Sequence, residues 1–323
     1  MEIKTSEIDI RECVLRQSGD LLKILLVDHS TEVNIIWATD SYEKLGEGFT
    51  ANMQIMPELI TGEHQHLIQP RAAKSRKEQR RRTKEKAEVF TPLKTIRKIN
   101  LAAERSGLPR KHNWQAYVRE LRLEITCGEA PFIVSRYNPT AHTGKLIALK
   151  NRVGFLDRKL RTVSKFCHDE AEWVAWAKEA FKASYGYEWQ GDNVLLAREN
   201  LLYTLIDYYQ DKFSNAPSLK LQEEFAEIIS WNIFQMDGLK YVVPMSCHSE
   251  SKIIPGERTL FEHTPDTLVE YKCLGCANGD PLNHNGQYVK IMDWEKNHCV
   301  RFVDQTRNGI SGAYQGAPFG PAP

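Results

Sequence analysis

Apolar residues recur along the middle of the chain in short runs and in helical stripes, which predicts alternating strands and helices. Residues 122–126 and 187–190 have the length and composition of buried strands. Residues 169–184 predict a helix that ends at Gly186, and residues 192–213 predict a longer helix with one apolar face. Strands that alternate with helices are typical of a parallel sheet covered by helices, so we expect an α/β fold.

The two ends of the chain show a different pattern. Residues 21–27 and 33–37 are β-rich runs separated by a turn, which predicts a small N-terminal sheet or hairpin. Beyond Cys247 the composition shifts to Pro, Gly, Asn, Cys and His, which predicts a β-rich module. Within it, residues 288–294 and 299–303 predict two strands joined by a turn.

These patterns divide the chain of 323 residues into four expected regions. They are a β-containing region at 1–70, a central α/β domain at 71–245 that opens with a basic segment, a Cys/His-containing β-rich module at 246–310, and a flexible tail at 311–323.

A strongly basic segment spans residues 71–86, although the whole chain carries a net charge of only +1. Nine Lys or Arg and two Glu leave about seven positive charges there, which predicts a site for an anionic partner such as double-stranded DNA. The alternative is a solvated helix face or linker. The expected DNA-binding residues are Arg76, Lys77, Arg80, Arg81, Arg82 and Lys84.

Neither a membrane segment nor a disulfide framework fits the sequence. No run approaches the ~18 apolar residues that cross a bilayer, and the start Met1-Glu2-Ile3-Lys4 leads into a charged segment. The seven cysteines are an odd number in a chain of this size. We therefore expect a soluble, cytoplasmic protein.

Cys273-Leu274-Gly275-Cys276 has the spacing of a zinc knuckle. A structural zinc site needs two further ligands, for which Cys247, His248, His263 and His284 are candidates. The favoured set is Cys247, Cys273, Cys276 and His284; a redox pair or unmetallated cysteines remain the alternatives.

Three segments place polar or small residues where predicted strands end. Glu124, Cys127 and Gly128 follow the first strand, and a glycine turn there lets backbone N–H groups approach a ligand. Glu188 and Asp192 follow the second strand, where an acidic residue can accept hydrogen bonds from ribose hydroxyls. An ordinary turn at Gly128 and a helix N-cap at Asp192 are the simpler interpretations.

A third segment, which follows a helix that begins after Ser218, is an apolar strand that delivers Asp237 to its carboxyl end. There a carboxylate could accept a hydrogen bond from the amine of an adenine ring. The simpler interpretation is a turn formed by Asp237-Gly238.

Together with Phe90-Thr91-Pro92, these segments make residues 61–240 resemble the adenine-N6 DNA methyltransferases, in particular methylase subunits of restriction-modification systems. The shared pattern is a Phe-Thr-Pro motif, a strand ending in Cys-Gly, an acidic residue before a Leu-Ala-Arg-x-Asn-Leu-Leu helix, and an acidic strand end. The resemblance implies a class I S-adenosylmethionine (SAM) methyltransferase-like fold with a doubly wound, mostly parallel sheet. The expected fold is completed by the N-terminal β/basic extension and the C-terminal β-rich, zinc-capable module described above.

The resemblance also implies a set of cofactor-binding residues and a reaction, the transfer of a methyl group from SAM to the amine of adenine in DNA. That set is Phe90, Thr91, Pro92, Glu124, Cys127, Gly128, Glu188, Asp192 and Asp237.

Two departures from the family pattern bear on activity. Ala130 stands where the cofactor loop of the family has a second glycine, and Pro131 follows it. The catalytic tetrapeptide, Asp/Asn/Ser followed by Pro-Pro and an aromatic residue, is absent from the sequence. Asp293-Trp294 is a weak substitute because a strand and turn explain both residues, so no catalytic residue is assigned. The alternatives are a second protein subunit that supplies the missing elements, or a catalytically inactive DNA-binding or interaction subunit.

Overall fold

The computed structural model describes residues 15–86, 89–105, 113–141, 144–256 and 265–306. The chain divides into two compact units, Met1–Gly238 and Leu239–Pro323. The division falls after Gly238, whereas the β-rich module was expected to begin at residue 246, and residues 15–70 belong to the same unit as the central sheet.

The first unit is built on a three-stranded parallel sheet, as the alternation of strands and helices predicts. Its strands are β3 (Arg122–Glu124), β4 (Ser184–Glu188) and β5 (Ile233–Gln235), in the order β3-β4-β5. Because all three strands run in the same direction, their carboxyl ends meet at one edge of the sheet.

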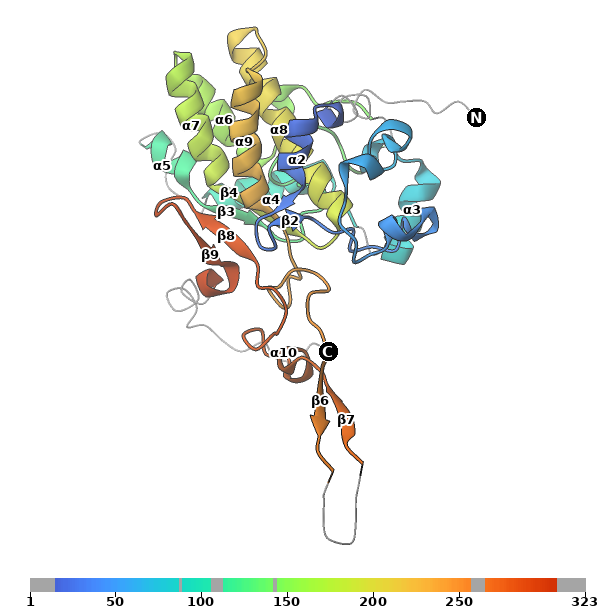
Figure 1. Ribbon diagram of the computed structural model, residues 1–323. Helices are drawn as coiled ribbons and strands as arrows, with labels where there is room; N and C mark the ends of the chain where they lie inside the picture. Colours follow the sequence, from blue (N-terminus) through green and yellow to red (C-terminus); the bar gives the residue numbers. More distant parts are fainter. Residues whose placement is uncertain (1–14, 87–88, 106–112, 142–143, 257–264, 307–323) are drawn as a thin grey trace, which may run out of the picture. The chain divides into compact units, whose positions relative to one another are not determined.

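Four helices pack on one another, and the last three of them also pack against this sheet (Figure 1). They are α6 (Phe155–Phe166), α7 (Glu170–Lys182), α8 (Gly191–Phe213) and α9 (Leu219–Asn232). The Ser218 hydroxyl caps α9 by accepting a hydrogen bond from the N–H of Leu221, as its position predicts. Phe181 and Phe225 pack edge to face between α7 and α9.

The predicted strand at residues 21–27 is wrong, because most of it is the helix α2 (Gly19–Leu26). Its leucines are buried at positions 21, 22, 25 and 26, which is the spacing of one helical face. Only the short strands β1 (Val27–Asp28) and β2 (Val33–Asn34) form the expected hairpin.

Gly186 does not end a helix. The helix α7 stops at Lys182, and Gly186 lies in the middle of β4, paired with Glu124 on one side and Ile233 on the other. A Cβ atom at this position would lie 3.0 Å from Ile133 Cδ1, so close packing favours glycine here.

The remaining elements of the first unit surround the sheet. They are the 3₁₀ helices η1 (Glu43–Leu45), η2 (Glu47–Phe49), η3 (Pro57–Leu59), η4 (Gly62–His64), η5 (Arg71–Ala73) and η6 (Leu149–Asn151), and the α-helices α3 (Arg76–Lys86), α4 (Leu93–Arg105) and α5 (Trp114–Arg119).

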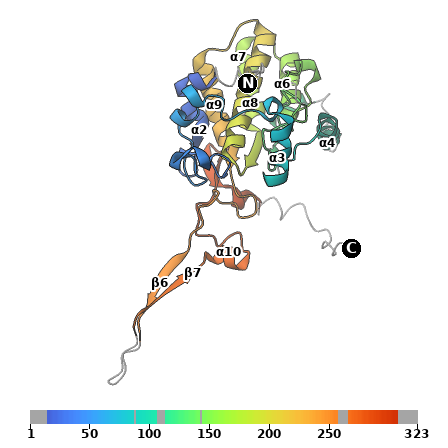
Figure 2. The ribbon, with the colours of Figure 1, turned by 90° about the vertical axis from the view of Figure 1, so that its right-hand side faces the viewer.

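Among its described residues, the second unit contains two antiparallel strand pairs, one short helix after the first pair, and a helical stretch at residues 302–306. The strands β6 (Glu250–Ile254) and β7 (Thr267–Tyr271) form a narrow ribbon, with α10 (Leu274–Asn278) directly after it (Figure 2). The strands β8 (Lys290–Asp293) and β9 (His298–Arg301) form the hairpin predicted near Asp293. Among the described residues of both units, no helix combines the length and apolar character that crossing a membrane requires.

Candidate functional site

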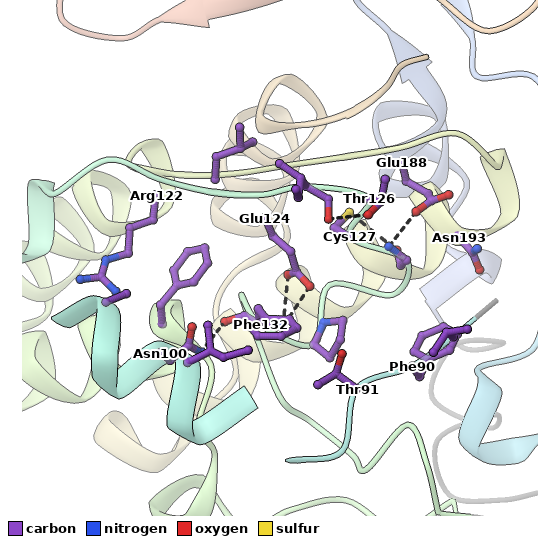
Figure 3. Close-up of a pocket in the computed structure, with 18 of the residues that line it drawn as sticks. Phe90, Thr91, Asn100, Arg122, Glu124, Thr126, Cys127, Phe132, Glu188 and Asn193 are labelled. Atoms are coloured by element: carbon purple, nitrogen blue, oxygen red, sulfur yellow. Dashed lines mark hydrogen bonds between the residues drawn. The ribbon is translucent and has the colours of Figure 1, made fainter. Parts of the chain in front are cut away.

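A cavity of about 840 Å³ opens at the carboxyl end of β3 in the first unit (Figure 3). Six of the predicted cofactor-binding residues line it, which are Phe90, Thr91, Glu124, Cys127, Gly128 and Glu188. They come from the segment before α4, from the end of β3 and the loop after it, and from the end of β4. In doubly wound sheets this edge is the usual place for a ligand.

Glu124, the last residue of β3, fixes the C-terminal part of the loop that follows β3. Its carboxylate accepts hydrogen bonds from the N–H groups of Phe132, at 3.2 Å, and Ile133, at 3.0 Å. Burial raises the pKa of Glu124 well above its usual range, although these hydrogen bonds oppose the shift. A buried carboxyl group is thereby fixed against the cavity wall.

The loop after β3 has an unusual backbone. Thr126, Gly128 and Ala130 all adopt left-handed conformations, with φ of 45°, 53° and 59°. Ala130 therefore holds the backbone conformation that a glycine adopts readily, although its side chain opposes that conformation. A Cβ atom on Gly128 would lie 3.3 Å from Cε1 of Phe90, so the absence of a side chain lets this aromatic ring approach the loop.

Glu188, the last residue of β4, fixes the N-terminal part of the same loop, at Gly128. Its carboxylate accepts hydrogen bonds from the N–H groups of Gly128, at 2.8 Å, Trp189, at 2.9 Å, and Gln190, at 3.3 Å. Burial raises the pKa of Glu188 above its usual value, although these three hydrogen bonds partly oppose the shift. The ends of two adjacent strands are thus connected through one carboxylate at the cavity.

Asp192 does not reach the cavity and is not the N-cap of α8. The helix begins at Gly191, and the carboxylate of Asp192 is fully buried. It accepts hydrogen bonds from the hydroxyl of Tyr42, at 2.7 Å, and the guanidinium of Arg82, at 2.9 Å. Burial alone would raise the pKa of Asp192, but attraction to Arg82 and Lys74 lowers it overall.

This ion pair corrects two predictions at once. Arg82, expected to contact DNA, is 3% exposed and its guanidinium pairs with Asp192, which was expected to bind ribose. The other five predicted DNA-binding side chains on α3, Arg76, Lys77, Arg80, Arg81 and Lys84, are exposed. The segment 71–86 thus folds as η5 and α3 and carries both solvent-facing and structural cations.

Pro92 and Asp237 lie outside the lining of the cavity. Asp237 is buried and follows β5, so its segment does lie at the predicted sheet edge. The lining also includes polar and aromatic residues that were not predicted, among them Asn100, Phe132 and Asn193. Asn100 donates hydrogen bonds to the carbonyls of Phe132 and Val153, so it positions the loop. Of these three, Phe132 ends the segment that resembles the cofactor loop and Asn193 adjoins Asp192, so both had a signal that could have revealed them, whereas Asn100 had none.

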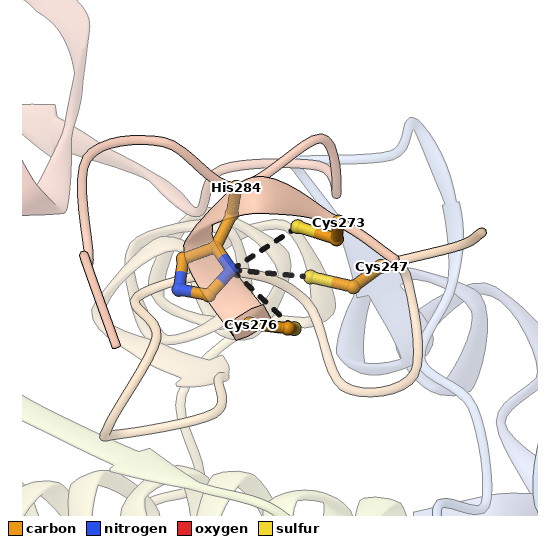
Figure 4. A group of neighbouring side chains, drawn as sticks. All are labelled: Cys247, Cys273, Cys276 and His284. Atoms are coloured by element: carbon orange, nitrogen blue, oxygen red, sulfur yellow. Dashed lines mark hydrogen bonds between the residues drawn. The ribbon is translucent and has the colours of Figure 1, made fainter. Parts of the chain in front are cut away.

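The second unit holds a separate group of metal-ligand side chains, the one predicted as a zinc site. Cys247, Cys273, Cys276 and His284 place their ligand atoms within 4.8 Å of one another (Figure 4). His284 Nδ1 lies 3.5 Å from the Sγ atoms of Cys247 and Cys273, and 3.7 Å from that of Cys276. A tetrahedral zinc with ordinary Zn–S and Zn–N bonds would separate such atoms by about 3.6 Å. The cluster could therefore bind a metal such as zinc.

The backbone around the cluster allows the ligand side chains to approach one another closely. A Cβ atom on Gly275 would lie 2.6 Å from His284 Nδ1, so the glycine between the two cysteines makes room for the imidazole. The N–H of Asn285 donates a hydrogen bond to Cys273 Sγ at 3.3 Å, which favours the thiolate form. His263, an alternative candidate ligand, lies outside the described residues, and the exposed His248 is not part of the cluster.

Comparisons of this chain with family models, curated proteins and solved structures gave no match.

Proposed function

We propose that the first unit binds SAM in the cavity at the end of β3, and that the protein is a DNA adenine-N6 methyltransferase or methylase subunit. One observation carries the proposal. Six of the nine residues that the sequence pattern assigned to the cofactor, Phe90, Glu124, Gly128 and Glu188 among them, line one cavity at the carboxyl edge of a parallel sheet.

The size of the cavity and the groups on its wall suit a nucleoside joined to an amino acid. About 840 Å³ lies within the usual range for a small-molecule site. A carboxylate offers about four acceptor positions, and Glu188 uses three of them for backbone N–H groups. The remaining position suits a ribose hydroxyl, and Phe90 offers an apolar surface.

The bound cofactor would supply the electrophilic methyl group, while the chain's own residues would bind and orient it. Glu124 and Glu188 are held by backbone N–H groups and would need little rearrangement on binding. The five exposed cations of α3 would attract the phosphate backbone of DNA.

A second candidate function is a cofactor-binding DNA subunit that has no activity by itself. The absence of the Asp/Asn/Ser-Pro-Pro-aromatic tetrapeptide favours it, because that motif orients the target amine. In this case a second subunit would supply the catalytic side chains.

The two functions differ in one experiment. The purified protein is incubated with SAM labelled in its methyl group and with duplex DNA that contains adenine. Transfer of label to adenine identifies a self-sufficient methyltransferase, whereas binding of labelled SAM without transfer identifies the subunit. If labelled SAM does not bind at all, both proposals are wrong.

A further inference from the structure

A second cavity in the first unit, of about 420 Å³, lies beside α3 and is lined mainly by cations. Its lining consists of Arg71, Arg76, Gln79, Arg80, Thr83, Lys84 and Thr140. Four of these seven residues are basic, the other three offer hydroxyl or amide groups, and none of these lining residues is acidic. The cavity thus gathers the groups that bind an oxyanion.

The helix itself produces this arrangement. Arg76, Arg80 and Lys84 are spaced four residues apart, so they project from one face of α3. Like charges at this spacing repel one another and destabilise a helix. An anion held between them would remove that repulsion.

Arg71 completes the cavity from outside the helix. It belongs to η5, and its guanidinium donates a hydrogen bond to Thr83 Oγ1 at 2.9 Å. The side-chain amide of Gln79 donates in turn to the carbonyl of Arg71 at 2.6 Å, which fixes η5 against α3. At 8% exposed, Arg71 is therefore a positioned cation rather than a mobile surface side chain.

Phe90 connects this cavity to the larger one. The guanidinium carbon of Arg71 lies 4.8 Å from the centre of the Phe90 ring, and Phe90 also lines the cavity at β3. A phosphate held near Arg71 would therefore be separated from the proposed cofactor site by the ring of Phe90.

We propose that the cavity beside α3 binds a phosphate group, and that this phosphate belongs to the DNA backbone next to the target base. The inference rests on the DNA-binding part of the proposed function and deepens it by naming where the backbone is held. The same chemistry could bind the phosphate of a free nucleotide, so the test includes both sources.

The test compares two full-length triple variants with equal loss of charge. One removes the cavity cations (Arg76→Gln, Arg80→Gln and Lys84→Gln), and the other removes exposed cations outside α3 in the first unit (Lys44→Gln, Lys150→Gln and Lys220→Gln). Binding of a fluorescent 20-base-pair duplex is measured by anisotropy across a range of salt concentrations. Binding of ATP and of inorganic phosphate is measured by calorimetry, and binding of S-adenosylhomocysteine serves as a further readout.

We expect the cavity variant to bind the duplex at least about tenfold more weakly than the control variant. Its plot of log affinity against log salt should be shallower by about one for each phosphate that the variant no longer neutralises. Equal losses in the two variants would overturn the proposal, since net charge alone would then explain binding. Cavity-dependent binding of ATP or phosphate with unchanged duplex affinity would overturn the assignment to DNA.

Failure of the proposal that the protein binds SAM would give a different result from failure of the phosphate site. If S-adenosylhomocysteine does not bind the wild-type protein but the duplex results are as expected, the cofactor proposal is wrong and the phosphate site stands. If the cavity variant also unfolds at a lower urea concentration than the control, the single variants Arg80→Gln and Lys44→Gln replace the triple variants in the same comparison.

Discussion

The guanidinium of Arg82 donates a 2.9 Å hydrogen bond to the carboxylate of Asp192, 110 residues further along the chain, and both side chains are buried. Two residues that the sequence assigned to two different ligands thus bind each other. The pair connects α3 to the start of α8, and the hydroxyl of Tyr42 reinforces it at 2.7 Å. This contact anchors the basic helix next to the sheet.

Arg82→Met is therefore expected to destabilise the fold rather than to act on DNA directly. Removing one partner leaves Asp192 charged and buried, which typically costs about 3–5 kcal/mol. Urea unfolding of Arg82→Met, Asp192→Asn and the double variant measures the coupling, with the exposed Lys77→Met as control. The double variant should lose less than the two single losses added together, and simple additivity would contradict the pairing.

Glu124 should make stability depend on pH. Burial raises its folded-state pKa above the ordinary value of 4.5, so the folded state binds more protons than the unfolded state above that pH. The contribution of Glu124 to the free energy of unfolding is complete below about pH 4.5, and it is lost as the pH rises through the folded-state pKa. Glu124→Gln, which remains uncharged, should lose less stability between pH 5 and pH 8 than the wild type does.

The measurement for Glu124 is the free energy of unfolding in urea at several pH values, with Glu58→Gln, an exposed carboxyl group, as control. The control should follow the wild type. An identical pH profile for Glu124→Gln and the wild type would contradict the assignment of a raised pKa.

The cluster in the second unit should bind about one zinc per chain. Cys276→Ser should lower the zinc content by most of its value, because a three-ligand remainder binds the ion more weakly. Cys299→Ser is the control, since this exposed cysteine lies outside the cluster. The assay is elemental analysis of purified protein.

Amide hydrogen exchange gives an independent readout of the zinc site. Cys247 precedes β6 and Cys273 follows β7, so a metal would join the two strands at one end of this ribbon. A two-stranded ribbon alone is only marginally stable, so chelation should speed exchange in both strands. A metal-free protein whose ribbon exchanges as slowly as before would contradict a structural zinc.

The cysteine cluster was predictable because its chemistry is local. A glycine between two cysteines three positions apart indicates a knuckle, and antiparallel pairing of β6 with β7 brings Cys247 to Cys273. The parallel sheet was also predictable, since its strands are separated by long amphipathic helices.

Other features depended on contacts that sequence patterns do not reveal. The apolar run at residues 21–27 suits a strand or a buried helix, and packing of α2 on α9 decides between them. The pairing of Arg82 with Asp192 joins distant segments, and nothing in either segment indicates it. The cations of α3 that line the cavity occur in the same basic run as Arg82. Only the folded structure shows that they are exposed and that Arg82 is buried.

The central claim is that the cavity between Gly128 and Glu188 binds the methyl donor, and calorimetric titration of S-adenosylhomocysteine into Gly128→Val and Gly62→Val tests it most directly. Both glycines have left-handed backbones, with φ of 53° and 58°, so both variants carry similar strain. Only at Gly128 would the new side chain meet Phe90, because no atom lies within 4 Å of a Cβ at Gly62. We predict binding to the wild type and to Gly62→Val, and affinity at least about tenfold weaker for Gly128→Val, a loss of about 1.4 kcal/mol. Absence of binding to the wild type, or equal affinities in both variants, would contradict the claim.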